Sequence, residues 1–165
     1  MAQSEPHTPA PGELMSTMVK IAGHMASIEI EVIDYENRLA TNESDADWLR
    51  CEVALNLGAV RGNLRTSFLV EDFECLTCEL QRVLNSCNGE ATFDTIENTL
   101  VISITLDRRG KGKVTGEANY LGPPSSTLKF TFETDQSYLQ ETEKALSQVM
   151  ANFPRKFRAT GPANG

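Results

Sequence analysis

The side chains best suited to chemistry in this sequence are a pair of cysteines, Cys75-Leu-Thr-Cys78. Two thiols at this spacing occur in redox-active dithiols and in zinc sites. On a helix, however, both thiols fall on the face opposite the apolar stripe, and no βαβ unit surrounds them. Cys51 and Cys87 are expected on other faces, so a zinc site with four ligands is not predicted. We expect small residues on an outer helix face and no metal ligands.

A glycine-containing basic segment, Asp107-Arg-Arg-Gly-Lys-Gly-Lys113, is the second candidate. Glycines beside cations can bind phosphate when a helix N-terminus follows them, because its N–H groups and dipole favour an anion. Here the pattern that follows is that of a strand. The segment therefore predicts a tight turn, and docking of an acidic partner or of an acidic part of this chain is the alternative.

The sequence contains two histidines, His7 and His24, and both precede the first strongly predicted strand. Proton transfer and metal binding near neutral pH commonly use imidazole, whose pKa lies near ambient pH. We therefore predict no catalytic residues, no cofactor and a non-enzymatic protein. A site built from carboxylates alone is the enzymatic alternative, although no pair of acids stands out by its spacing.

The single tryptophan, Trp48, opens a segment in which apolar and polar residues alternate as far as Leu57. Alternate residues of a strand face opposite sides of the sheet. Trp48, Arg50 and Glu52 therefore share the polar face. A large ring in that position is either covered by a second structural layer or offered to a partner as an interface anchor.

Acidic residues surround this strand and the strand predicted before it. They are Glu29, Glu31, Asp34, Glu36, Glu43, Asp45 and Asp47. Carboxylates that begin the next predicted helix, Glu71 and Asp72, complement the helix dipole, whereas the earlier cluster has no such local explanation. It is either a solvated face or a negative surface that speeds the docking of a basic partner.

The composition limits the class of protein. A chain of 165 residues with 40% hydrophobic content fits a single domain. Its net charge of −8 argues against nucleic-acid binding, which needs a basic footprint, and suits a basic protein partner. No apolar run approaches the roughly 20 residues that cross a bilayer, and the polar N-terminus does not resemble a secretory signal. We expect no membrane association and a cytoplasmic location.

Hydrophobic periodicity predicts the elements that would position these residues. Alternation predicts strands near residues 28–32, 49–57, 60–68, 91–96, 100–106, 114–118 and 128–133. Apolar residues spaced by three and four predict one helix over 70–87, ended by Asn88-Gly89, and another after Thr134-Asp135 that runs to about residue 150. Residues 1–14 are expected to form a disordered lead, 15–154 a single domain and 155–165 a flexible tail.

This order of elements lacks the regular alternation of strand and helix that builds a parallel sheet. It predicts an α+β fold. We expect one curved, mainly antiparallel sheet of about six to seven strands, with both helices packed on one side of it.

Several short motifs along the chain match the pattern of one known family. They are Asp47-Trp48-Leu49 with Cys51-Glu52-Val53, the turn from Gly58 to Leu64, Glu71-Asp72-Phe73, Asn88 to Phe93 with Glu97 and Leu100, Gly110-Lys-Gly112, Leu128-Lys-Phe130, Asp135-Gln136 and Phe153-Pro154. On these residues the sequence resembles the WapI-type bacterial immunity proteins, cytoplasmic antidotes to wall-associated contact-dependent toxins, over roughly residues 27–154. The proline-containing lead, the cysteine pair and Arg108-Arg109 depart from the family pattern.

The resemblance implies a small binding protein that occupies the working surface of a toxin and has no catalysis of its own. We therefore expect a non-enzymatic immunity protein that binds a basic protein, with a nuclease-type toxin domain as the partner. The residues expected on the partner surface are Glu29, Glu31, Asp45, Asp47, Trp48, Arg50 and Glu52.

Two alternatives belong to different functional classes. The first is a ligand-binding or catalytic domain with a pocket between the sheet and its second layer. The second is a homo-oligomeric module in which Ile33, Tyr35 and Val101 meet a second copy. The sequence leaves the oligomeric state and the redox behaviour of the cysteine pair open.

Overall fold

The fold is that of a computed structural model that describes residues 16–157. Its elements, in chain order, are β1 (Thr17–Ala22), β2 (Ala26–Tyr35), α1 (Glu43–Ala46), β3 (Trp48–Leu57), β4 (Val60–Leu69), α2 (Val70–Ser86), β5 (Gly89–Asp94), β6 (Leu100–Leu106), β7 (Lys111–Tyr120), β8 (Ser126–Asp135) and α3 (Gln136–Asn152). The expected disordered lead, residues 1–14, and most of the expected tail lie outside the described residues.

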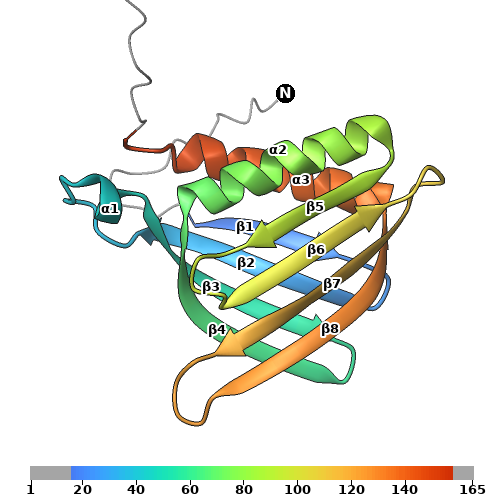
Figure 1. The fold of residues 1–165 in the computed structure, drawn as a ribbon, viewed down its shortest axis with the longest axis horizontal. Coiled ribbons are helices and arrows are strands. Elements are labelled where there is room, and N and C mark those ends of the chain that lie inside the picture. The colour runs from blue at the N-terminus through green and yellow to red at the C-terminus, as the bar shows by residue number, and fades with distance from the viewer. Residues whose placement is uncertain (1–15, 158–165) are drawn as a thin grey trace, which may run out of the picture.

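The strands form two antiparallel sheets of four strands each, in the orders β1-β2-β3-β4 and β5-β6-β7-β8. The α+β class is therefore confirmed, whereas the prediction of one sheet with six to seven strands is wrong. The sheets separate at α2, because this 17-residue helix follows β4 directly and leads into β5. Figure 1 shows the two sheets facing each other, with α2 and α3 side by side along the edges formed by β1 and β5.

Local sequence explains why the strands pair as they do. In the β3–β4 hairpin, Gly58 adopts a positive φ of 70° and connects the pair Leu57 and Val60. The apolar residues of β3 are buried on one face, as the alternation predicts. In the first strand, β1, Val19 and Ile21 are buried while Met18 and Lys20 are exposed.

The two long helices cover the outer edges of β1 and β5. In α3, the Thr142 hydroxyl donates to the carbonyl of Lys20 at 2.8 Å. In α2, a carboxylate oxygen of Glu79 accepts from the backbone N–H of Thr92 at 2.7 Å. Both helices were predicted. The left-handed residue that ends α2 is Cys87, with a φ of 47°, rather than the expected Gly89, which begins β5.

The hydrophobic core fills the space between the sheets and beneath the helices. Its centre holds three aromatic rings, Phe68, Phe73 and Phe93, whose centroids lie 5.1 to 6.1 Å apart. These rings come from β4, α2 and β5, so one aromatic cluster joins the first sheet to the second.

The two sheets also meet where the β1–β2 turn touches β8. The backbone N–H of His24 donates to the carbonyl of Glu133 at 3.3 Å, and the Thr134 hydroxyl donates to the carbonyl of Ala22 at 2.6 Å. A Cβ atom at Gly23 would lie 2.1 Å from the Glu133 carbonyl oxygen. The turn can therefore approach β8 this closely only because residue 23 is a glycine.

Candidate functional site

The candidate site is the outer face of the first sheet, away from the core. Along β3 the exposed or half-buried residues Trp48, Arg50 and Glu52 alternate with buried Leu49 and Cys51, which confirms the predicted alternation. Five of the seven expected surface residues lie on this face of β2 and β3. Asp45 extends the face beyond the start of β3, from the short helix α1. We call this set Glu29, Glu31, Glu52, Arg50, Trp48 and Asp45 the outer strip.

One end of the outer strip is balanced in charge. Glu31 lies opposite Glu52 in the register of β2 and β3. Arg65 of β4 contacts Glu52 at 3.1 Å, and Lys20 of β1 contacts Glu29 at 3.0 Å. These acids and Arg65 line an open recess of about 540 Å³. Cations from the flanking strands therefore pair with two of the three acids at this end and partly balance their charge.

The other end of the outer strip is acidic and contains Trp48. Half-buried Trp48 lines a recess of about 380 Å³, together with three carboxylates, Glu36, Asp45 and Glu97. The indole Nε1 donates to the carbonyl of Ser44 at 3.0 Å, which fixes the ring against α1. The ring is thus partly covered by α1 and partly open, and three carboxylates lie around its open side.

Glu97 belongs to this recess although the expected partner surface did not include it. It lies in the turn between β5 and β6, so it comes from the second sheet. Sequence alternation relates residues within one strand and carries no signal for such a contact. The only feature of the sequence that pointed to Glu97 was its place among the motifs that resemble the WapI-type family.

Helix α1 places Asp45 because Asn42 caps its first turn. The Asn42 side-chain oxygen accepts from the Asp45 backbone N–H at 2.9 Å, and its amide donates to the Asp45 carboxylate at 3.1 Å. Both contacts lie within four residues, so the local sequence sets the position of this carboxylate. The segment between β2 and β3 thus contains one short helix.

Asp47 does not join the outer strip. It is only 9% exposed, and its carboxylate accepts from the backbone N–H of Lys156 at 2.8 Å. Its backbone carbonyl accepts from Val70 at 2.9 Å, where α2 begins. Asp47 thus holds the C-terminal segment and the start of α2 against the end of β3.

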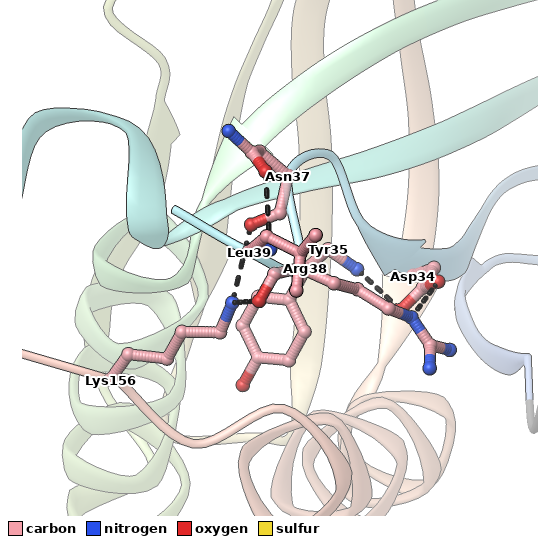
Figure 2. A network of polar contacts seen from close by, with 6 residues as sticks. All are labelled: Asp34, Tyr35, Asn37, Arg38, Leu39 and Lys156. Carbon is pink, nitrogen blue, oxygen red and sulfur yellow. Dashed lines mark hydrogen bonds and ion pairs between the residues drawn. The ribbon is translucent and has the colours of Figure 1, made fainter. Parts of the chain in front are cut away.

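A polar network fixes the loop that precedes α1, and Figure 2 shows its members. Asp34 pairs with Arg38 at 2.5 Å. The Lys156 ammonium lies 4.1 Å from the centroid of the Tyr35 ring and 3.3 Å from the carbonyl oxygens of Asn37 and Arg38. The loop beside the acidic recess is therefore held by the C-terminal segment.

Tyr35, which the oligomer hypothesis placed on a surface, takes part in this contact. Its hydroxyl donates to the carbonyl of Pro154, and its ring packs edge-on against Phe153 at 5.7 Å. Burial, and then Asp47 and Asp34, raise the pKa of Tyr35 above its ordinary value. Contacts within the chain already occupy this ring.

The remaining sequence candidates have structural explanations. Cys75 and Cys78 are exposed on the outer face of α2, as predicted. Burial and the neighbouring Glu71 raise the pKa of the Cys75 thiol, which disfavours the reactive thiolate. Within residues 16–157, no three histidine, cysteine or acidic residues are grouped so that they could hold a metal ion.

The basic segment forms the tight turn between β6 and β7. The Asp107 carboxylate accepts from the backbone N–H groups of Arg109 and Lys111 at 2.8 and 3.0 Å, and Gly110 has a φ of 77°. These bonds confirm the predicted turn.

The fold and the site define a small two-sheet α+β protein with a charged outer face and a tryptophan beside an acidic recess. The chain belongs to the immunity protein WapI-like family, whose profile matches residues 20–154. This match confirms the resemblance inferred from the motifs.

Comparison with known proteins adds one structural similarity. The "CdiA-CT/CdiI toxin and immunity complex from Enterobacter cloacae" contains a chain with 10% identity and a TM-score of 0.38, and the alignment covers 61% of this chain and 88% of that chain. No curated protein matches the sequence. None of the helices in the described part of the chain is both long and apolar enough to cross a membrane.

Proposed function

We propose that this protein is a non-enzymatic immunity protein that neutralises a toxin by binding it through the outer strip and the acidic recess beside Trp48. The observation that carries the proposal is the family match over residues 20–154, which spans both sheets and both long helices. The proposed role needs no cofactor, and we propose that it is carried out in the cytoplasm.

The chemistry of the acidic recess at the Trp48 end of the strip supports a basic partner. Glu36, Asp45 and Glu97 line a recess with an aromatic ring that is partly open, and interface anchors are often aromatic residues that lose their remaining water when the partner docks. A domain that cuts nucleic acid needs cations to bind phosphates. A nuclease-type toxin domain would therefore present the charge that complements this recess, and the pairing would speed association.

The seven predicted surface residues take different parts in this proposal. Asp45 and Trp48 form the centre of the contact, and Arg50, Glu52, Glu31 and Glu29 extend it along the sheet. Asp47 has a positioning role, because its carboxylate holds the backbone of Lys156 beside the recess. A charge-reversal test should therefore leave Asp47 unchanged.

The test is affinity capture from the native host with the full chain as bait, followed by mass spectrometry. The parent should recover one basic polypeptide in equal amount, and expression of that polypeptide should be toxic unless the parent is present. The triple variant E36K/D45K/E97K should bind it more slowly by at least about tenfold. Its association rate should also no longer rise as the salt concentration is lowered, as the rate of the parent should.

The matched control is E90K/E141K/E143K, which makes the same change in charge at exposed or half-buried residues away from the recess. It should bind like the parent, and Trp48→Ala should raise the dissociation rate. Equal association rates for the two triple variants would contradict the assigned surface. Recovery of a small-molecule ligand with no protein partner would contradict the proposed function itself.

A further inference from the structure

One edge of strand β8 pairs with no other strand of the described chain, and Glu133 at its end accepts a backbone bond from the β1–β2 turn. Its even-numbered residues direct their backbone groups toward β7, because Gln136 donates to Gly110 just beyond the strand and sets the pattern of the antiparallel ladder. The odd-numbered residues therefore direct N–H and C=O outward. The bond from His24 to the Glu133 carbonyl confirms this direction.

Three outward residues, Thr127, Lys129 and Thr131, remain available on this edge. Among residues 16–157, no backbone or side-chain group bonds to their N–H or C=O groups. Each supplies one donor and one acceptor. The pairs repeat about every 6.6 Å along the edge, which is the two-residue period of a strand.

A groove runs beside the same edge. It has a volume of about 660 Å³, and one wall is formed by every residue of β8 from Leu128 to Glu133. Successive side chains of a strand point to opposite faces, so a groove that touches all six residues must follow the edge of the strand. In Figure 1 the β1–β2 and β3–β4 turns lie on the side of β8 away from β7, and they form the other wall.

The groove is apolar along its inner side. Leu128, Phe130 and Phe132 are half-buried there, and the opposite wall includes Met25 and Val60, which are 86% and 49% exposed. Exposed apolar side chains beside unpaired backbone groups are the features to which an added strand binds, because its backbone pairs with the edge and its alternate side chains enter the groove.

We propose that the edge of β8 is a second recognition surface, which binds an extended segment of a partner polypeptide as an added antiparallel strand. The segment would place apolar side chains opposite Leu128 and Phe130, and an acidic side chain opposite Lys129 on the outer face. A second copy of this chain fits less well, since it carries the same net charge of −8 and would bring its own Lys129 to the pairing.

This surface is independent of the outer strip. Trp48 begins β3 and Leu57 ends it, so the recess and the groove lie at opposite ends of a ten-residue strand, about 30 Å apart. The β8 edge can therefore be tested without the partner proposed above.

The test uses the full chain, labelled with ¹⁵N, and the peptide acetyl-Ser-Thr-Val-Glu-Val-Thr-Ser-amide at up to about 1 mM, a concentration that reveals weak binding. The amide signals of Thr127, Lys129 and Thr131 should shift, and their hydrogen exchange should slow. The variant Lys129→Pro removes one outward donor without removing a bond to β7, and it should weaken binding by about tenfold.

Asn63→Pro is the matched control. It makes the same change on the free edge of β4, where odd-numbered residues also point outward because Val70 donates to Asp47 beyond that strand. It should not weaken binding. A peptide methylated on the backbone nitrogen of its Glu should lose affinity for the unaltered protein, which tests the pairing even where a variant fails to fold.

Three results would overturn the proposal. The first is the absence of shifts on β8 at the highest peptide concentration. The second is equal affinity for the parent and a folded Lys129→Pro variant, or for the peptide and its methylated form. The third is a concentration-dependent dimer in which the three outward amides are already protected, because the edge would then belong to a second copy.

Discussion

The Trp48 side chain is held by a hydrogen bond and also lines the acidic recess. Its indole nitrogen donates to a carbonyl of α1, which holds the ring, while the ring lines a recess with Glu36, Asp45 and Glu97. A fixed ring loses little conformational freedom when a partner docks on it, which favours binding. Negative potential around the ring should act on small ions as it acts on a protein partner.

Quenching of the single tryptophan should report that potential. Iodide should quench Trp48 less in the parent than in the triple variant E36Q/D45N/E97Q, because the carboxylates repel the anion. The measurement is a Stern–Volmer titration at an ionic strength of about 0.1 M, where the Debye length is about 10 Å. Neutral acrylamide is the control and should quench both proteins alike. Equal iodide constants would show that the carboxylates do not act on the ring.

At the scale of elements, α3 illustrates how a short sequence sets the start of a helix. The Asp135 carboxylate accepts from the backbone N–H groups of Ser137 and Tyr138 at 2.9 and 3.2 Å. Chiefly the Ser137 hydroxyl, and then these N–H groups, hold the pKa of Asp135 below its ordinary value of 3.8. A carboxyl whose pKa is lowered by folding stabilises the folded state while it is ionised.

The variant Asp135→Ala should therefore melt at a lower temperature than the parent at pH 7. The difference should persist above the ordinary pKa of 3.8 and shrink as the pH falls through the lower pKa of the folded state. Thermal unfolding followed by circular dichroism at several pH values measures this. Asp135→Asn keeps an acceptor oxygen and should melt closer to the parent. A melting difference that does not change with pH would mean that the charged cap is not responsible.

The elements show where sequence patterns suffice. The β3–β4 hairpin and α2 were predictable because their signals are local, namely alternation around Gly58 and an apolar stripe from Phe73 onward. Strand β1 was missed because it is short, and its exposed Met18 weakens the alternation. The recess beside Trp48 was only half predictable, since Glu97 reaches it from another sheet.

At the scale of the whole molecule, the C-terminal segment ties distant parts of the chain together. Arg155 contacts Glu74 of α2 at 2.7 Å and Glu71 at 3.4 Å, while Lys156 bonds to Asp47 and to the loop before α1. Arg155 and Lys156 thus make defined contacts at the start of the predicted flexible tail. The expected domain limits at 15 and 154 stay predictions.

A chain that ends at Pro154 should lose these contacts. Its free energy of unfolding should fall by roughly 1–3 kcal/mol, which corresponds to a few hydrogen bonds. Amide hydrogen exchange over residues 36–47 should become faster, because Lys156 no longer holds the loop. A chain that ends at Phe157 keeps the contacts and should behave like the parent. Unchanged exchange in the shorter chain would show that the loop is stable without the segment.

The division into two sheets was beyond the reach of local patterns. A strand shows the same alternation of apolar and polar residues whichever strand it pairs with. The sequences of β4 and β5 therefore do not reveal that these two strands belong to different sheets. Partner choice depends on which edges the helices cover, and that is a property of the assembled core.

The contact of Gly23 with the Glu133 carbonyl has a consequence for the architecture. The aromatic cluster joins the sheets through side chains, which can adjust, but at residue 23 the main chain of one sheet rests on the main chain of the other. Only a hydrogen atom fits between the two main chains at this position. The width of the interior at that end of the protein is therefore set by the residue that contributes no side chain to fill it.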